Sequence, residues 1–243
     1  MTDQGSSPIL AIRGVRKSYR RGVARGASVV QSLAGVDLEI EQGEITAILG
    51  KSGSGKSTLG RCLAFLESPD EGEVLFHGGR VDFRNRESLG LVRRRVQMVF
   101  QDPARAISPY FSVEQTLMEP FAGSGANSKR GEHQIPSLLE RVGLSSSLLP
   151  QRARNLSGGQ AQRLVLARAM ATDPEVLILD ESFAGLDLSL QAAWVNLLLG
   201  LVEEKGLTCV LITHDEALAC QLADRIVSLK QGRVVSAPSG ESR

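Results

Sequence analysis

One run of nine residues sets the architecture of this chain: Gly50-Lys51-Ser52-Gly53-Ser54-Gly55-Lys56-Ser57-Thr58. Its first eight residues match G-x-x-x-x-G-K-[ST], between an apolar run at 45–49 and a helical pattern at 58–66. A strand, a Gly-rich turn and a helix in that order turn backbone N–H groups and a helix N-terminus toward phosphate. We therefore expect Mg²⁺-ATP at 50–58, with Lys56 on the β- and γ-phosphates and Ser57 on Mg²⁺. A Gly/Ser turn with a solvated lysine is the structural alternative.

The remaining apolar runs predict an α/β fold. Short runs at 96–100, 176–179, 210–212 and 226–229 alternate with helical patterns at 164–171 and 188–202. Such alternation favours a mainly parallel sheet covered by helices, the core of a P-loop NTPase. Before it, apolar and acidic residues alternate at 36–41, which predicts a half-buried strand of an N-terminal antiparallel β layer.

The pattern changes between Asp102 and Arg154, where Gly, Ser and Pro separate two helical patterns at 113–121 and 135–142. We interpret residues 102–156 as an inserted helical subdomain, with a flexible surface loop at 123–131. The whole ATPase domain is expected at 8–238, and residues 1–7 and 239–243 are expected to be flexible tails.

Composition excludes several function classes. The 243 residues carry 28 Lys plus Arg and 27 Asp plus Glu, so no strong net charge would attract nucleic acid or an anionic membrane. No apolar stretch reaches the roughly 18 residues of a spanning helix, which predicts a soluble, cytoplasmic chain. The three cysteines, Cys62, Cys209 and Cys220, lie in apolar patterns and are expected to be buried and reduced.

Two carboxylates follow a buried strand. Asp180 and Glu181 come directly after the apolar run 176–179, so both emerge at the carboxyl end of the strand, where ligands bind in α/β sheets. We expect Asp180 on the Mg²⁺ side and Glu181 to polarise the attacking water as a general base. Taken alone, the pair is also compatible with a simple strand end.

A second short motif points to a family: Leu156-Ser157-Gly158-Gly159-Gln160. Ser157 can cap a helix whose Gly-lined N-terminus offers N–H groups to an anion such as a γ-phosphate. Together with the phosphate loop, the run 176–181 and His214, this motif makes the chain resemble the ATP-binding subunit of an ABC transporter. The resemblance implies that these five residues contact ATP held by the phosphate loop of a second chain, so that two chains enclose two nucleotides head to tail.

The resemblance also implies roles for four single residues. Tyr19 matches the aromatic residue that stacks on adenine, although an exposed tyrosine in an Arg-rich turn is an alternative. Gln101 matches the glutamine that senses Mg²⁺ and water where the helical subdomain hinges. His214 matches the switch histidine that touches the γ-phosphate, and Asp187 matches the aspartate of the loop between the two sites. Glu181, His214, Gln101 and Lys56 are then the catalytic set, and Ser57, Gln101 and Asp180 the Mg²⁺ set.

One segment departs from the family pattern. Members usually read Asp-Glu-Pro-Thr-Ser-Ala-Leu-Asp where this chain reads Asp180-Glu181-Ser182-Phe183-Ala184-Gly185-Leu186-Asp187. Ala184 lacks the hydroxyl that family members often contribute across the dimer at this position.

Further motifs resemble the peptide and nickel importer branch, in particular the second ATPase of nickel importers. They are Gln97-Met98-Val99-Phe100-Gln101-Asp102-Pro103 and Asp187-Leu188-Ser189-Leu190-Gln191. This branch implies a second, different ATPase chain, with a second copy of this chain as the alternative, two membrane-spanning permease subunits and, indirectly, an extracytoplasmic solute-binding protein. The chain is then expected at the cytoplasmic face of the inner membrane as a peripheral subunit, importing peptide, nickel or a metal chelate.

Two alternatives use the same cassette without transport. One is an ATPase acting on nucleic acid or ribosomes, but its usual second cassette or long arms are not visible, and a solvated helix end explains Arg93-Arg94-Arg95 better than DNA binding. The other is an assembly factor in a soluble metabolic complex, which co-purification with membrane subunits would separate from a transporter. We expect no nucleic-acid partner.

Overall fold

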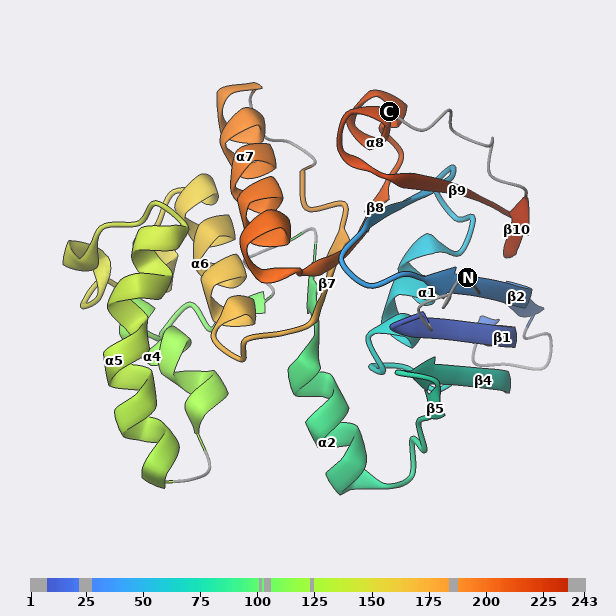
Figure 1. The fold of residues 1–243 in the computed structure, drawn as a ribbon, viewed down its shortest axis with the longest axis horizontal. Coiled ribbons are helices and arrows are strands. Elements are labelled where there is room, and N and C mark those ends of the chain that lie inside the picture. The colour runs from blue at the N-terminus through green and yellow to red at the C-terminus, as the bar shows by residue number, and fades with distance from the viewer. Residues whose placement is uncertain are drawn as a thin grey trace, which may run out of the picture.

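The computed structural model describes residues 8–21, 28–100, 102, 106–122, 125–183 and 188–235. Its strands form two sheets (Figure 1). A six-stranded sheet has the order β10-β9-β3-β8-β7-β6, formed by Arg233–Val235, Arg225–Lys230, Ile45–Leu49, Thr208–Thr213, Val176–Asp180 and Val96–Val99. All its neighbours pair in parallel except β10 with β9. A four-stranded antiparallel sheet has the order β2-β1-β4-β5, formed by Ser28–Ile40, Leu10–Arg21, Glu71–Phe76 and Gly79–Arg80. The predicted parallel sheet with an antiparallel layer is confirmed.

Seven α-helices are described: α1 Lys56–Leu63, α2 Arg86–Arg95, α4 Val113–Met118, α5 Gly125–Arg141, α6 Gly158–Met170, α7 Leu188–Lys205 and α8 Glu216–Leu222. Short 3₁₀ turns occupy Glu119–Phe121, Ser146–Leu148 and Ala153–Asn155. Helices α4, α5 and α6 pack on one another and lie on the left in Figure 1, away from the antiparallel sheet on the right. The predicted insertion at 102–156 contains α4 and α5, and its boundaries stay a prediction.

The expected surface loop at 123–131 is wrong for most of its length, because α5 begins at Gly125. Glycine is a poor helix former, so the local sequence argues against a helix here. Tertiary packing overrides that preference at Gly131, where an added Cβ would lie 2.8 Å from the Phe121 ring and 2.9 Å from Met118 Sδ. The glycine lets α5 approach these two side chains closely.

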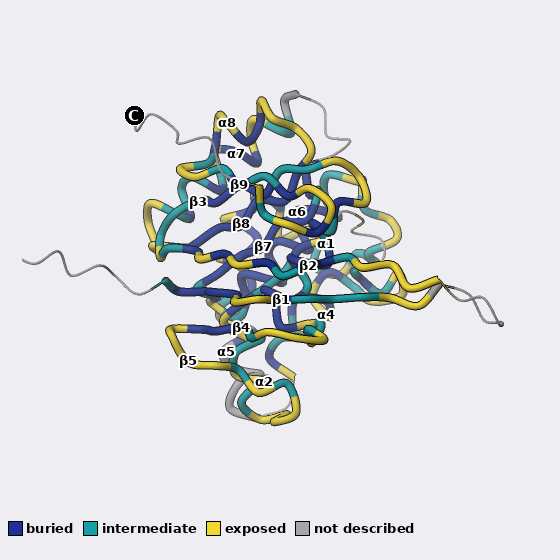
Figure 2. Tube along the Cα trace, turned by 90° about the vertical axis from the view of Figure 1, so that its right-hand side faces the viewer, coloured by how far each residue is buried: buried dark blue, intermediate teal, exposed yellow. Residues whose placement is uncertain are grey.

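The six-stranded sheet separates two hydrophobic cores, and alternate residues of each central strand face opposite cores. Leu177, Leu179 and Leu211 pack with the helices α4 to α7, whereas Ile178 and Val210 pack with α1 and the antiparallel sheet. Figure 2 shows β3, β7 and β8 in dark blue at the centre of the molecule. Burial on both faces explains why these strands read as continuous apolar runs.

The parallel arrangement brings three predicted site segments to one edge of the sheet. Strands β3, β8 and β7 are neighbours and run in the same direction, so their carboxyl ends lie side by side. Gly50 follows β3, His214 follows β8, and β7 ends at Asp180. This edge is where an open α/β sheet binds its ligand.

The cysteines and the arginine run differ in part from expectation. Cys62 and Cys209 are buried as predicted, and burial raises the pKa of the Cys62 thiol to about 12. Cys220 is exposed on α8, so its predicted burial is wrong; the residue faces outward on an amphipathic helix. Arg93 to Arg95 end α2, but Arg93 donates two hydrogen bonds to Phe65 O and Arg95 pairs with Glu175, so the run is only partly solvated.

Within the described part of the chain, we find no helix whose length and hydrophobicity would let it span a bilayer.

Candidate functional site

The phosphate loop follows β3 and wraps the N-terminus of α1 in a conformation that requires glycine. Gly55 precedes α1 with φ 106°, and an added Cβ would lie 2.3 Å from Ser32 O. At Gly50 an added Cβ would lie 2.5 Å from Leu229 O. Backbone of this kind is open only to glycine, which also leaves N–H groups uncovered by side chains. The loop is therefore shaped to bring its backbone against an anion.

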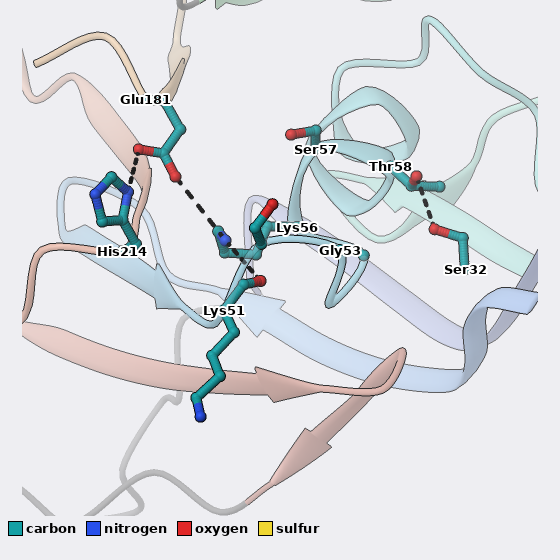
Figure 3. A pocket seen from close by; sticks show the side chains of 10 residues that line it. Ser32, Lys51, Gly53, Lys56, Ser57, Thr58, Glu181 and His214 are labelled. Carbon is teal, nitrogen blue, oxygen red and sulfur yellow. Dashed lines mark hydrogen bonds and ion pairs between the residues drawn. The ribbon is translucent and has the colours of Figure 1, made fainter. Parts of the chain in front are cut away.

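A cavity of about 660 Å³ lies in front of this loop. Its described lining comes from the loop, α1, β2 and the ends of β7 and β8: Ser32, Lys51, Ser52, Gly53, Gly55, Lys56, Ser57, Thr58, Glu181 and His214. Figure 3 shows these side chains around one opening, with Lys51 turned away from Glu181. Seven of the nine predicted loop residues thus line one cavity; Gly50 and the buried Ser54 are not part of its lining.

Lys56 lies beneath the loop with its side chain only 7% exposed. Its Nζ donates hydrogen bonds to Gly50 O at 2.6 Å and Lys51 O at 3.2 Å, and it lies 3.9 Å from Glu181 Oε1. These contacts hold the ammonium between the loop and the Glu181 carboxylate. A charge in this place can offset the charge of bound phosphates.

Ser57 and Asp180 meet beside the cavity as a candidate Mg²⁺ site. Ser57 Oγ donates a hydrogen bond to Asp180 Oδ1 at 3.1 Å, which joins the start of α1 to the end of β7. Burial raises the pKa of Asp180, since it disfavours the charged carboxylate. A hydroxyl and a carboxylate are hard oxygen ligands, and Mg²⁺ typically takes one or two of these together with phosphate oxygens and water. The two residues therefore fit the ion.

Glu181 lies between His214 and Lys56 and has a strained backbone. Its φ of 52° is left-handed, and its N–H donates to Ile212 O at 2.9 Å. Its Oε2 lies 2.7 Å from His214 Nδ1, and the carboxylate side chain is 15% exposed against 67% for the histidine. The dashed lines of Figure 3 mark both contacts of the carboxylate. Non-glycine residues in this conformation gather at functional sites, where the surroundings hold them.

The motif at 156–160 begins α6 and lies outside this cavity. Ser157 caps the helix: its Oγ accepts from Gln160 N at 3.3 Å, and its own N–H donates to Gln160 Oε1 at 3.0 Å. A Cβ on Gly158 would meet nothing within 4 Å, whereas one on Gly159 would lie 2.6 Å from Leu190. Of the described residues, none from 156 to 160 lines the phosphate-loop cavity. Ser157, Gly159 and Gln160 line a separate hollow with Leu148 and Arg163 among its other residues.

The predicted adenine contact, Tyr19, lies on β1 next to the start of α1. Its hydroxyl donates to Glu67 Oε1 at 2.6 Å and lies 3.4 Å from Thr58 Oγ1, which itself lines the cavity. Burial and then the hydrogen bond to Glu67 raise the pKa of Tyr19. The other two single residues, Gln101 and Asp187, lie outside the described residues, as does Ala184.

Sequence reasoning missed Ser32. This residue lies on β2, lines the cavity, and donates to Thr58 Oγ1 at 2.9 Å. No motif marks it, because its place depends on how β2 packs against α1. The alternation at 36–41 predicts the strand but does not extend back to residue 32.

Comparison with known proteins agrees with the site. A family model described as ABC transporter matches residues 33–184. The chain is 34% identical to the dipeptide transport ATP-binding protein DppF of Haemophilus influenzae, over 95% of this chain and 71% of that protein. It is 40% identical to the nickel import ATP-binding protein NikE of Escherichia coli, over 93% of this chain and 85% of that protein.

A solved structure described as the dimeric structure of MJ0796, a bacterial ABC transporter cassette, superposes with a TM-score of 0.82 at 30% identity. The superposition covers 94% of this chain and 97% of the MJ0796 chain. The sequence-based resemblance to peptide and nickel importers is confirmed by these relatives. The chain belongs to the ABC transporter family, as one of its ATP-binding ATPase subunits.

Proposed function

We propose that this chain hydrolyses ATP as one half of a head-to-tail pair of ATPases beneath the membrane subunits of an importer. One observation carries the pairing. The phosphate-loop cavity and the Ser157-capped end of α6 are both built to receive phosphate, yet they are separate on this chain. A helix N-terminus that offers N–H groups can bind an anion, and a second chain's ATP would supply one.

We infer the chemistry at the cavity from its described residues and from the family resemblance. The N–H groups of the loop and Lys56 Nζ bind the β- and γ-phosphates of ATP, and Tyr19 stacks on the adenine. Ser57, Asp180 and Gln101 would hold Mg²⁺, which would neutralise charge on the phosphates. Glu181 accepts a proton from a water molecule as the water oxygen attacks the γ-phosphorus. The bond between the γ-phosphorus and the bridging oxygen breaks, which gives ADP and phosphate. His214, on the same carboxylate, orients Glu181 and faces the γ-phosphate.

We infer the solute from the relatives and the partners from the family resemblance. DppF and NikE are named for dipeptide transport and nickel import, so we infer a peptide, nickel or a metal chelate as the solute. The remaining subunits would be a second ATPase, two permeases and, indirectly, an extracytoplasmic binding protein. The ATPase domain would span 8–238, and its insertion at about 102–156 would dock on a permease. Asp187 would lie between the two paired nucleotide sites. The chain would bind at the cytoplasmic face of the inner membrane.

The Ser157→Arg variant tests this function. The large cation would block the N–H groups of α6, so hydrolysis at the partner's phosphate loop should fall at least tenfold while this chain keeps its own affinity for ATP. Phosphate release is measured for the isolated chain, the detergent-purified complex and the complex carrying the variant. Gly90→Arg is the control for an added cation, because this exposed position on α2 lies outside the insertion and an added Cβ there would meet nothing within 4 Å. Full activity in the isolated monomer, or a Ser157→Arg complex as active as wild type, would overturn the proposal.

A further inference from the structure

The residue after Glu181 is held from two sides inside the molecule. Ser182 is 2% exposed, and its Oγ donates to Val99 O at 3.2 Å. Its own carbonyl oxygen accepts a hydrogen bond from Gln162 Nε2 at 3.3 Å. Val99 is the last residue of β6, and Gln162 lies on α6. The backbone that carries Glu181 is therefore tied to a neighbouring strand and to a helix.

Packing fixes the same segment one residue further on. The ring of Phe183 lies edge-on against Trp194 of α7, with centroids 5.9 Å apart and planes at 72°. Both side chains are buried. Glu181 has the left-handed backbone described above, which persists only where neighbouring contacts hold it. Ser182 and Phe183 directly follow Glu181 in the chain, so their contacts are the nearest ones that can hold this backbone.

Gln162 is an unusual choice for this position if stability were its only purpose. Its Nε2 must face Ser182 O, because two carbonyl oxygens would repel one another. That orientation leaves Gln162 Oε1 buried, with no hydrogen-bond partner among the described residues. An unpartnered buried acceptor lowers stability, and an apolar side chain of the same size would avoid that cost. The amide is better explained by what its single bond to Ser182 does.

The helix that carries Gln162 also carries the site for the second chain's nucleotide. Ser157 caps α6, and Gln162 lies five residues further along, about 7.5 Å at the rise of an α-helix. A helix of this length moves as one body, so a shift at the Ser157 end displaces the Gln162 amide as well. The bond to Ser182 then passes the displacement to the residue beside Glu181.

We propose that Gln162 and Ser182 are positioning residues, which hold the Glu181 carboxylate in place for hydrolysis and couple it to the Ser157 end of α6. The inference rests on the proposed role of Glu181 as general base. Neither side chain is placed to touch ATP: of the described residues, neither lines the phosphate-loop cavity. Their effect is on turnover, not on nucleotide binding.

Gln162→Met tests the amide with little change in volume. We expect kcat for ATP hydrolysis to fall about 10- to 100-fold, as small displacements of a catalytic group do, with the KM for ATP within about twofold. The melting temperature, followed through the buried and single Trp194, should stay equal or rise. Gln97→Met is the matched control, because Gln97 Nε2 also donates to a backbone carbonyl, that of Arg93, away from the cavity. The control should keep kcat within about twofold.

Variants at Ser182 test the second hydrogen bond of this segment, from Ser182 Oγ to Val99 O. Ser182→Ala should lower kcat and Ser182→Thr, which keeps the hydroxyl, should restore most of it. The losses in Ser182→Ala and Gln162→Met should not simply multiply when the two changes are combined, because their two hydrogen bonds hold the same residue beside Glu181. Losses that simply multiply would show two independent effects and overturn the coupling.

The assay includes wild type and Glu181→Gln so that two kinds of failure are distinct. If Glu181→Gln hydrolyses ATP like wild type, the proposed function of the site fails, and this inference with it. If Glu181→Gln is inactive while Gln162→Met and Ser182→Ala both retain wild-type kcat, the site stands and the positioning role is overturned. A loss of kcat matched by an equal loss of ATP affinity would also contradict it.

Discussion

Lys56 is the residue on which we expect nucleotide binding to depend most directly. Its ammonium is held by the carbonyl oxygens of Gly50 and Lys51 and faces Glu181. The carbonyl contacts also fix the shape of the loop around it.

Lys56→Ala should abolish ATP binding. Without the ammonium, the cavity loses the cation that is held between the loop and Glu181. A ligand at 100 times its Kd adds about 2.7 kcal/mol to the stability of a folded protein, so wild type should melt visibly higher with Mg²⁺-ATP and the variant should not. Lys230→Ala, an exposed lysine at the end of β9, should keep the full shift. An equal shift for Lys56→Ala would mean that the nucleotide binds elsewhere.

At the scale of single elements, glycines inside two helices have opposite roles. Gly131 in α5 is in close contact with Phe121 and Met118, whereas a Cβ on Gly90 in α2 would meet nothing within 4 Å. The first glycine is required by packing, and the second only weakens its helix.

Gly131→Ala and Gly90→Ala should therefore change stability in opposite directions. The added methyl group at Gly131 forces the Phe121 ring to move and should cost about 1–2 kcal/mol despite the better helix propensity of alanine. At Gly90 the same substitution should stabilise by about 0.5–1 kcal/mol. Denaturant unfolding of the two variants measures both effects. A stabilised Gly131→Ala would show that α5 does not pack as described.

Asp70 joins β1 to the segment that precedes β4. Its carboxylate accepts hydrogen bonds from Lys17 Nζ at 2.9 Å and from Ser18 N at 2.7 Å, and these lower the pKa of Asp70 below its usual 3.8. A lowered folded-state pKa contributes stability that is present above the unfolded value and is lost as the pH falls through the folded value. The side chain is 44% exposed, so solvent screening keeps the contribution small.

Asp70→Asn should lower the free energy of unfolding by about 0.5–1 kcal/mol at neutral pH. The difference from wild type should shrink as the pH falls below about 3.8, because Asp70 itself then becomes protonated. Unfolding curves across this pH range test it, with Glu140→Gln on α5 as a control for the loss of one exposed charge. A difference that stays constant with pH would contradict the assigned hydrogen bonds.

For the whole molecule, the sequence was informative wherever chain order alone brings residues together. The loop at 50–58, the carboxylates after β7 and His214 after β8 each follow a buried strand, and parallel pairing places them at one edge. Contacts between distant segments could not be read in this way. Phe121 packs closely against Gly131 of α5. The position of Ser32 depends on how β2 packs against α1, and the exposure of Cys220 depends on which face of α8 is covered.

The same limit applies to the two hydrogen bonds that hold Ser182 beside Glu181. Gln162, Ser182 and Val99 come from three elements, and no spacing in the sequence relates them. The two segments expected to bind phosphate, 50–58 and 156–160, are far apart in the sequence, which does not say whether they share one pocket. Only the fold shows that the Ser157 end of α6 lies outside the cavity formed by the loop.

The central claim is that the cavity between the phosphate loop and Glu181 hydrolyses ATP with Glu181 as the base. The most direct test is phosphate release by wild type and Glu181→Gln at equal, independently measured ATP occupancy. Loss of a general base typically removes 10²–10⁴-fold of rate, or about 3–5 kcal/mol of barrier stabilisation. We predict a loss of at least about 100-fold with unchanged ATP affinity; a variant that keeps more than half of the wild-type rate would contradict the account.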